Sequence, residues 1–445
     1  MNTSYKAAFR GGFFMPGDLM HQTSRWTIAD ALKVHADDPT TTMPVIAADF
    51  PTMSESVMIW DTGALRDINM NSVTVNGWHV IWSLAADKVD LTNANIAAEW
   101  ANRNNTAYIG FWYSKTGNGS DWIWGGRLLQ KSADLRPWEW SGNLVMREGS
   151  ENTVDMFYTS CGPVNNDFES VIAVSTGQIH TDDQKVWFTG FDTTVDMFDA
   201  DGVHEANEAE DPYFDFRDPC PFLNPDDGRI YCVYETNVAG MRGQFVIGAN
   251  ETGPIPPNYT VDPGAGYGAA SIGLAILDDG AYEAGDFSRA RWTQLGPIVS
   301  ALGVNDQTER PHVVFQNGKL YLFTISHHST YSGNLQGPDG VYGFVSDNGL
   351  AGPFRPMNAS GLVLGNPSSQ PYSTYSHFVD AQGYVQSFID HVPTPTATDP
   401  NAVRIGATLA PTVKLVLDDD HSYLTEIHNY GEIFAQRAWP ATAAG

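Results

Sequence analysis

Short alternating runs of apolar and polar residues, separated by turns, occupy most of the chain. The apolar runs are rich in aromatic and β-branched residues and are bounded by Gly, Asn and Asp, which is typical of strands in an all-β protein. One short helix is expected near the start, where Thr27 can cap the segment TIADALKV. No regular alternation of strands and helices appears, so a Rossmann fold or a TIM barrel is disfavoured. Residues 1–25 show no periodic pattern and are expected to form an N-terminal arm that is mobile.

One β unit recurs along the chain. Each copy has an apolar strand, a turn with Gly in its second position, and a second strand rich in aromatic or β-branched residues. The copies lie at 73–84, 217–234, 309–325 and 374–389, and their turn glycines are Gly77, Gly228, Gly318 and Gly383. The first interval has room for two units and contains another strand pair at about 108–126. About five such units indicate the blades of a β-propeller, with a β-sandwich as the alternative that the unequal spacing leaves open.

The charge of the chain is strongly negative. Lys and Arg number 24 against 52 Asp and Glu, which gives a formal net charge of 24 − 52 = −28. Such a surface disfavours nucleic-acid and membrane partners, because phosphates and anionic lipids need basic patches. Only 8 of the 24 basic residues are Lys. Adaptation to high salt and ordinary solubility at low pI explain this bias equally well, and activity above about 1 M salt would distinguish them.

Three segments place an acidic residue at or just before the start of the first strand of a unit. These residues are Asp61 in IWDTGALRD, Asp218 in FRDPCPF and Glu309 in TERPHVVF. First strands of propeller blades line the central axis, so the three carboxylates are expected to converge. A single Asp at a strand end would carry no such implication, because Asp is common in turns. Converging carboxylates suit glycoside cleavage. One attacks or stabilises the anomeric carbon, and another donates a proton with a pKa raised by crowding.

The neighbours of these acids also fit a sugar pocket. Arg217 and Arg310 can keep some carboxylates ionised or hold sugar hydroxyls, and Trp60 and Trp140 offer flat rings to the apolar faces of a sugar.

Other chemistries find less support in the motifs. Metal binding is the competing use of clustered acids, but no zinc spacing and no EF-hand loop are present. The adjacent His327 and His328 should point to opposite faces of a strand, with His327 facing the site. The chain also lacks the GxSxG motif of serine hydrolases and the P-loop that cradles phosphates.

Many segments resemble bacterial levansucrases of glycoside hydrolase family 68, most of all the Gram-negative members. The matching stretches extend from about residue 26 to 430 and include ADALKVHADDPTTTMPVI, IWDTGALRD, FRDPCPF, YETNVAG, GVNDQTERPHVVFQ, GPDGVYGFVSD and SGLVLGNPSSQP. The resemblance implies a single five-bladed β-propeller over residues 26–445, with a funnel-shaped central pocket. It implies transfer of a fructosyl unit from sucrose to β-2,6 fructan, to oligosaccharides or to water. An enzyme that makes β-2,1 linkages or mainly hydrolyses sucrose remains open, whereas a non-catalytic fructan-binding lectin would not need three acids.

The resemblance also implies roles for single residues. Asp61 would be the nucleophile that forms a covalent fructosyl–enzyme intermediate, Asp218 the transition-state stabiliser, and Glu309 the general acid/base. Residues that match the substrate pocket are Trp60, Trp140, Ser141, Arg217, Glu235, Gln307, His327 and Tyr375. His327 and Gln307 stand where Gram-positive relatives carry Arg and Glu, which bears on acceptor handling and product length.

No cofactor and no metal are expected. Asp306 matches a calcium ligand of Gram-positive relatives, but Gram-negative members generally lack that site. The first residues contain no apolar segment like that of a standard secretory signal. Several Gram-negative relatives leave the cell without a cleaved signal peptide, so an extracellular enzyme is expected. The expected partners are sucrose, fructan and sugar acceptors, and the oligomeric state is not predicted.

Overall fold

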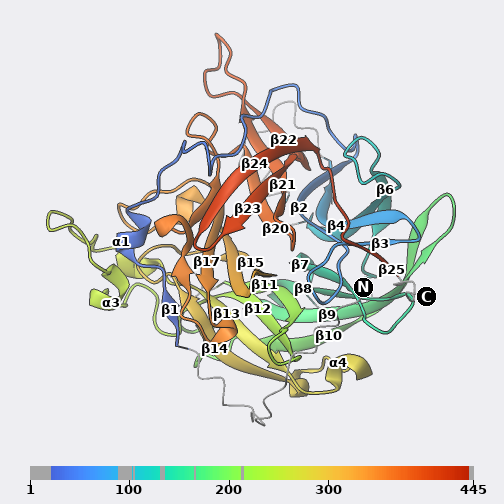
Figure 1. Cartoon of the computed structure of the whole chain (residues 1–445), viewed down its shortest axis with the longest axis horizontal. Coiled ribbons are helices and arrows are strands. Elements are labelled where there is room, and N and C mark those ends of the chain that lie inside the picture. The colour runs from blue at the N-terminus through green and yellow to red at the C-terminus, as the bar shows by residue number, and fades with distance from the viewer. Residues whose placement is uncertain are drawn as a thin grey trace, which may run out of the picture.

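Five mainly antiparallel sheets surround a central axis (Figure 1), which confirms the predicted five-bladed β-propeller. The computed structural model describes residues 22–88, 103, 106–130, 136–164, 167–211 and 215–439. Most of the predicted N-terminal arm, residues 1–21, lies outside the described residues. Its last two residues form strand β1 (Ser24–Arg25), which pairs with the third sheet.

Each sheet is built mainly from one stretch of chain. The first contains β2 (Val57–Ala64), β3 (Val73–Val75), β4 (Trp78–Asp87), β5 (Tyr108–Ser114), β6 (Ile123–Arg127) and β25 (Arg437–Trp439). The second contains β7 (Trp138–Met146), β8 (Thr153–Val164), β9 (Asp167–Thr181) and β10 (Val186–Asp199). The third contains β1, β11 (Phe216–Leu223), β12 (Ile230–Asn237), β13 (Ala270–Leu277) and β14 (Trp292–Ser300). The fourth contains β15 (Glu309–Gln316), β16 (Lys319–Ser326), β17 (Gly340–Ser346), β18 (Arg355–Pro356) and β19 (Leu362–Gly365). The fifth contains β20 (Thr374–Val379), β21 (Tyr384–Pro393), β22 (Val403–Leu409), β23 (Pro411–Asp418) and β24 (His421–Tyr430).

The helices of the described residues are all short. They are α1 (Ile28–Ala31), α3 (Ala249–Thr252), α4 (Ala281–Ala284) and the 3₁₀ turns Ala265–Tyr267, Arg289–Arg291, His328–Thr330, Gly349–Ala351 and Met357–Ala359. Thr27 caps α1 as predicted: its hydroxyl accepts the Asp30 N–H at 3.2 Å, and the Asp30 carboxylate accepts the Thr27 N–H at 3.3 Å. In the part of the chain that the structure describes, no helix has the length and apolar character needed to cross a membrane.

The four predicted turn glycines each connect two paired strands. All four have a positive φ, between 73° and 84°, a conformation that Gly adopts without a steric penalty. They lie between β3 and β4, β11 and β12, β15 and β16, and β20 and β21. The predicted unit at 108–126 is wrong as a separate blade, because β5 and β6 extend the first sheet. The missing blade is β7–β10, whose first two strands are joined by the longer turn 147–152.

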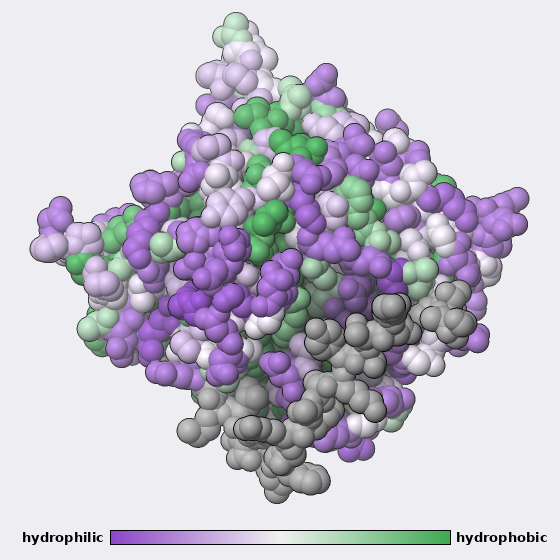
Figure 2. Space-filling view, in the orientation of Figure 1, coloured by the Kyte–Doolittle hydropathy of each residue, from purple (hydrophilic) through white to green (hydrophobic). Residues whose placement is uncertain are grey.

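The innermost strands close the ring. β2 packs against β7, β7 against β11, β11 against β15, β15 against β20, and β20 against β2. Hydrophobic clusters fill the space between sheets, and one of them joins Trp82, Tyr158 and Phe388 from three different sheets. Polar residues cover most of the molecular face seen in Figure 2, as expected for this acidic chain.

The C-terminal strand ties the end of the chain to the first blade. β25 pairs in parallel with β3, Arg437 binds Asp67 at 2.9 Å, and the Trp439 indole N–H donates to the Ser150 carbonyl at 3.1 Å. Only 3% of Trp439 is exposed. The last strand therefore connects the first and second blades.

Trp439→Ala should lower the free energy of unfolding by about 3–5 kcal/mol, because a large buried ring is replaced by a cavity. Urea denaturation of the whole protein measures this loss. Trp187→Ala is the matched control, since Trp187 is 37% exposed on β10. Equal losses in the two variants would contradict a stabilising role for the last strand.

Candidate active site

A cavity of about 320 Å³ lies at the axis, where all five innermost strands contribute side chains. Its walls contain the predicted residues Trp60, Asp61, Trp140, Ser141, Arg217, Asp218, Gln307, Glu309, His327 and Tyr375. The other two predicted residues, Glu235 and Arg310, lie behind this wall and contact it from the protein side. The structure thus brings the three acids together as expected. Asp61 and Asp218 lie inside their strands, however, and only Glu309 begins its strand.

A β-bulge interrupts each innermost strand at the level of the cavity. The pairing register shifts between Ile59 and Thr62, Trp140 and Gly142, Arg217 and Cys220, Glu309 and His312, and Tyr375 and Phe378. At three of the bulges a residue other than Gly has a positive φ: Asp218 at 62°, Arg310 at 45° and Ser376 at 60°. Bulges redirect side chains and free the backbone from the ladder, so they aim these residues at or around the axis.

Hydrogen bonds join the bulges of neighbouring blades and hold this strained backbone. The Asp218 N–H donates to Thr159 Oγ1 at 2.8 Å, and Asp218 Oδ2 accepts the Arg310 N–H at 3.0 Å. The buried Arg310 guanidinium donates to the Ser376 hydroxyl and to the Thr62 carbonyl at 2.9 Å. Arg310 therefore links four blades, its own and those of Asp218, Ser376 and Thr62, through buried contacts. In the structure it does not reach the cavity, and the predicted contact with sugar hydroxyls gains no support there.

The Arg217 guanidinium is shared among several carboxylates. Nη1 binds Asp215, Nε binds Glu235 at 2.6 Å, and Nη2 binds Glu309 at 2.9 Å. Nε also lies 3.9 Å from Asp218 Oδ2. Glu235 stands opposite Arg217 in the β11–β12 pairing, so strand register places this pair. The buried carboxyls of the site are thereby arranged around one fixed cation. Burial raises the pKa of Asp215 to about 7 and also raises the pKa of Glu235.

The protonation of the acids differs from the expectation. Burial, opposed by Arg217 and helped by Asp61 and Glu309, raises the pKa of Asp218 to about 7. Burial also raises the pKa of Glu309, but Arg217, His327 and the Tyr375 hydroxyl lower it by more, so its net pKa lies below the usual value. The sequence predicted a raised pKa for the proton donor, Glu309. In the structure the pKa of Asp218 is raised instead.

Tyr375 and His327 complete the surroundings of Glu309. The Tyr375 hydroxyl donates to Glu309 Oε2, and His327 Nε2 lies 4.0 Å from the same oxygen. The two rings stack with centroids 3.7 Å apart. His327 lines the cavity as predicted, whereas His328 Nδ1 bonds the Gly337 carbonyl at 2.6 Å. Both histidines follow the end of β16. The alternation of side chains along a strand, on which the prediction was based, is therefore not what points them in different directions.

Two buried polar atoms of the wall lack a hydrogen-bond partner among the described residues. They are Ser141 Oγ and Gln307 Oε1. Buried polar atoms are normally paired, because an unpaired one costs about 1–3 kcal/mol. A ligand that carries hydroxyl groups would supply the missing partners, which fits a sugar.

Some wall residues were not predicted from the sequence: Leu84, Arg103, Ala107, Ser329, Thr330 and Phe388. Arg103 binds Asp390 at 2.7 Å and lies 5.4 Å from the Trp60 ring centroid. No motif surrounds this arginine in the sequence, and only the fold brings it to the pocket.

Asp306, the residue that matches a calcium ligand of Gram-positive relatives, is bound by an arginine. Both oxygens of Asp306 are bound by the Arg242 guanidinium, which also binds Asp211 at 2.9 Å. Both carboxylate oxygens of this residue thus pair with a cationic group of the protein itself.

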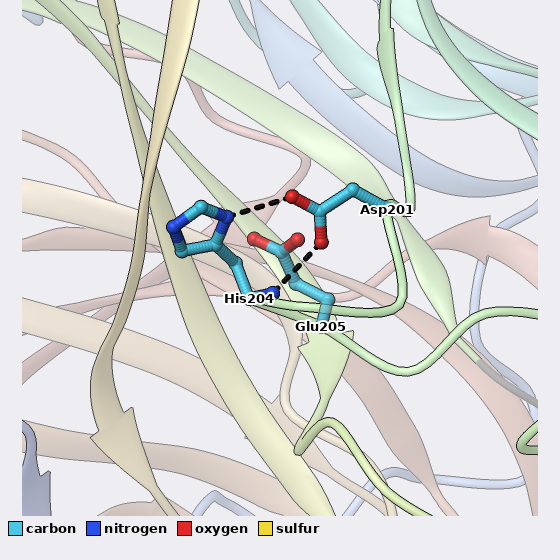
Figure 3. A group of neighbouring side chains, drawn as sticks. All are labelled: Asp201, His204 and Glu205. Carbon is cyan, nitrogen blue, oxygen red and sulfur yellow. Dashed lines mark hydrogen bonds and ion pairs between the residues drawn. The ribbon is translucent and has the colours of Figure 1, made fainter.

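Among the described residues, one group of side chains lies close enough to hold a metal ion, and it is outside the pocket wall (Figure 3). Asp201 accepts the backbone N–H and bonds Nδ1 of His204, both at 2.7 Å. Glu205 accepts the Tyr234 hydroxyl and the Gln294 amide. Asp201 and His204 thus pair with each other, and Glu205 pairs with Tyr234 and Gln294.

The comparisons with known proteins agree with this geometry. The chain matches the levansucrase/invertase family over residues 17–434. It belongs to glycoside hydrolase family 68. The chain is 52% identical over 420 residues to a levansucrase of Zymomonas mobilis, with 94% of each chain covered. It is 48% identical to an extracellular sucrase of the same bacterium, which covers 94% of this chain and 96% of that one. The crystal structure of levansucrase from Gluconacetobacter diazotrophicus superposes with a TM-score of 0.82 at 35% identity, covering 95% of each chain. The predicted family, including its Gram-negative type, is confirmed.

Arg217→Met should lower the free energy of unfolding by about 3–5 kcal/mol at pH 8, because it leaves buried carboxylates without a cation. The loss should shrink toward pH 5, since the orphaned carboxyls then fold in their protonated form. Arg289→Met is the control, as this half-exposed arginine binds only surface acids such as Asp199 at 2.8 Å. A loss in Arg217→Met that does not depend on pH would contradict the shared-cation interpretation.

Proposed function

We propose that the protein is a levansucrase, a retaining fructosyltransferase that cleaves sucrose and transfers the fructosyl unit to β-2,6 fructan, to oligosaccharides or to water. The observation that carries the proposal is the convergence of Asp61, Asp218 and Glu309 on one cavity. The identity of 52% to a named levansucrase supports the same activity.

The three acids divide the reaction between them. Asp61 attacks the anomeric carbon of the fructosyl unit, while Glu309 gives its proton to the departing glucosyl oxygen. The covalent fructosyl–Asp61 ester is then attacked by an acceptor hydroxyl, whose proton returns to Glu309. Asp218 accepts hydrogen bonds from fructosyl hydroxyls and stabilises the positive charge that develops in both transition states. Two displacements retain the configuration at the anomeric carbon. The carboxyl groups of Asp61 and Glu309 should therefore lie about 5–5.5 Å apart.

The proton must lie on Glu309 when the glucosyl group leaves. The raised pKa of Asp218 and the lowered pKa of Glu309 favour a proton on Asp218 before sucrose binds. A fructosyl hydroxyl that donates to Asp218 favours its ionised form, whereas the glycosidic oxygen beside Glu309 favours the protonated acid. Substrate binding therefore favours transfer of the proton from Asp218 to Glu309, which donates it to the leaving group.

The rest of the wall binds the sugar. Trp60 and Trp140 give apolar ring surfaces for sugar C–H groups. Ser141 Oγ and Gln307 Oε1 gain hydroxyl partners, and Arg217 stays fixed by its carboxylates. No residue of this mechanism requires a metal or an organic cofactor.

The linkage of the product and the share of hydrolysis remain separate questions. An inulosucrase or a mainly hydrolytic β-fructofuranosidase would use the same acids, because water and sugar acceptors compete for one intermediate. A lectin is disfavoured by the complete set of acids. The relative named extracellular sucrase supports an enzyme that acts outside the cell, where it would meet sucrose and fructan.

Incubation with sucrose, with glucose and fructose quantified separately over time, should release more glucose than fructose, because part of the fructose is transferred. Linkage analysis of the product then identifies levan or inulin. Equal release would favour the hydrolytic alternative, and release of neither sugar would contradict the proposed substrate.

Asp61→Asn should abolish turnover while the fold persists, and Glu309→Gln should slow glucose release by about 10²–10⁴-fold, the usual worth of general acid help. Initial rates and circular dichroism check both. Asp347→Asn, an exposed carboxylate that binds Arg355, is the control. Normal turnover in either site variant would remove that residue from the mechanism.

The activity should fall as the pH rises through about 7, because the carboxyl cluster then loses the proton held at Asp218. The measurement is kcat/KM for sucrose between pH 4 and pH 9. A constant kcat/KM up to pH 9 would contradict the proton transfer described above.

A further inference from the structure

Asp339 is a buried carboxylate next to the pocket wall that the mechanism has not used. It immediately precedes β17, and 1% of the residue is exposed. Its Oδ2 lies 3.2 Å from His327 Nδ1, and its Oδ1 accepts the His328 backbone N–H at 2.6 Å. An ionised carboxylate only accepts hydrogen bonds, so Nδ1 of His327 carries a proton.

This contact fixes where the other ring nitrogen points. The His327 ring lies flat on Tyr375, with an angle of 7° between the planes. Its Nε2 faces Glu309 Oε2 at 4.0 Å, the same oxygen that accepts the Tyr375 hydroxyl. His327 thus lies between two carboxylates: its Nδ1 faces the buried Asp339, and its Nε2 faces Glu309 in the cavity wall.

Charged groups from several strands face this ring. Asp339 precedes β17, Glu309 begins β15, and Asp390 on β21 also acts on His327, although Arg103 neutralises part of its charge. Burial lowers the pKa of His327, but Asp339 first and then Glu309 and Asp390 raise it by more, so its pKa lies above the usual 6.5. Arg217 binds the other carboxylate oxygen of Glu309, Oε1, at 2.9 Å.

We propose that Asp339 is a positioning residue that holds the His327 ring against Tyr375 as a doubly protonated imidazolium, with the Nε2–H directed at Glu309 and at the glucosyl oxygens beside it. The inference rests on the proposed function, since the leaving glucosyl group is what the His327 ring would bind. Asp339 touches no substrate and acts only through His327. The imidazolium donates a hydrogen bond to the glucosyl unit, and it orients the acid/base carboxyl together with Tyr375.

Asp339→Asn tests this role because it keeps the shape of the side chain and an acceptor oxygen but removes the charge. The pKa of His327, followed by NMR of ¹³C,¹⁵N-histidine-labelled protein, should fall by about one unit or more. His327→Gln identifies the signal to follow. In kinetics, Asp339→Asn should lower kcat/KM for sucrose by about 10–100-fold, the range found when the residue that orients a metal-binding histidine is changed.

A double-mutant cycle separates positioning from general stability. In the His327→Gln background, Asp339→Asn should change kcat/KM by less than about twofold, because the residue has nothing left to position. Equal losses in both backgrounds, or an unchanged His327 titration, would overturn the proposal. Asp347→Asn is the matched control: it follows the same strand, β17, and its side chain is 52% exposed. It should change neither readout.

The outcomes also separate this inference from the proposed function. The NMR titration needs no substrate, so it judges the Asp339–His327 pair even if sucrose proves not to be turned over. Sucrose turnover by the unaltered protein with an unshifted titration in Asp339→Asn would overturn the positioning role alone.

Discussion

The pocket depends on one buried cation that several carboxylates share. Without Arg217, the acids Asp215, Glu235 and Glu309 would face one another in a largely buried site, and most would fold only in their protonated form. With it, the cluster holds fewer protons, and their distribution responds to what binds. A glycosidase that alternates between proton donor and proton acceptor needs such a balance, since one carboxyl must lose and regain a proton in every cycle.

The propeller places this cluster through its bulges as much as through its blades. Each innermost strand leaves the regular ladder at the level of the cavity, and Arg310 joins the bulge of its own blade to those of three others through its backbone N–H and its guanidinium. The same hydrogen bonds therefore join neighbouring blades and position the residues around the cavity. A change in the packing between blades would reach the reacting groups directly, because little flexible structure lies between them.

The sequence predicts the repeating hairpins well, since Gly77, Gly228, Gly318 and Gly383 mark turns whose positive φ leaves a local signal. It also predicts most of the pocket, because the acids occur beside recognisable motifs. It does not predict the second blade, whose longer first turn hides the repeat. Nor does it predict Arg103 and Asp339, which reach the site only through tertiary packing. Arg310 was placed among the substrate contacts because it adjoins Glu309, yet its positive φ turns it toward the neighbouring blades.

The division of the cavity into a strand-built floor and a loop-built rim suggests why one chemistry serves different products in this family. Asp61 and Asp218 lie within innermost strands that hydrogen bonds lock across blades, so the fructosyl–enzyme intermediate forms in a rigid setting. Gln307 precedes β15, and Ser329 and Thr330 lie in the 3₁₀ turn that follows β16. Connecting segments generally tolerate sequence change better than the strands that they join. In the proposed reaction, we expect the intermediate to meet its acceptor on this side. Selection can therefore alter the competition between water and sugar at the rim without disturbing the proton balance around Arg217.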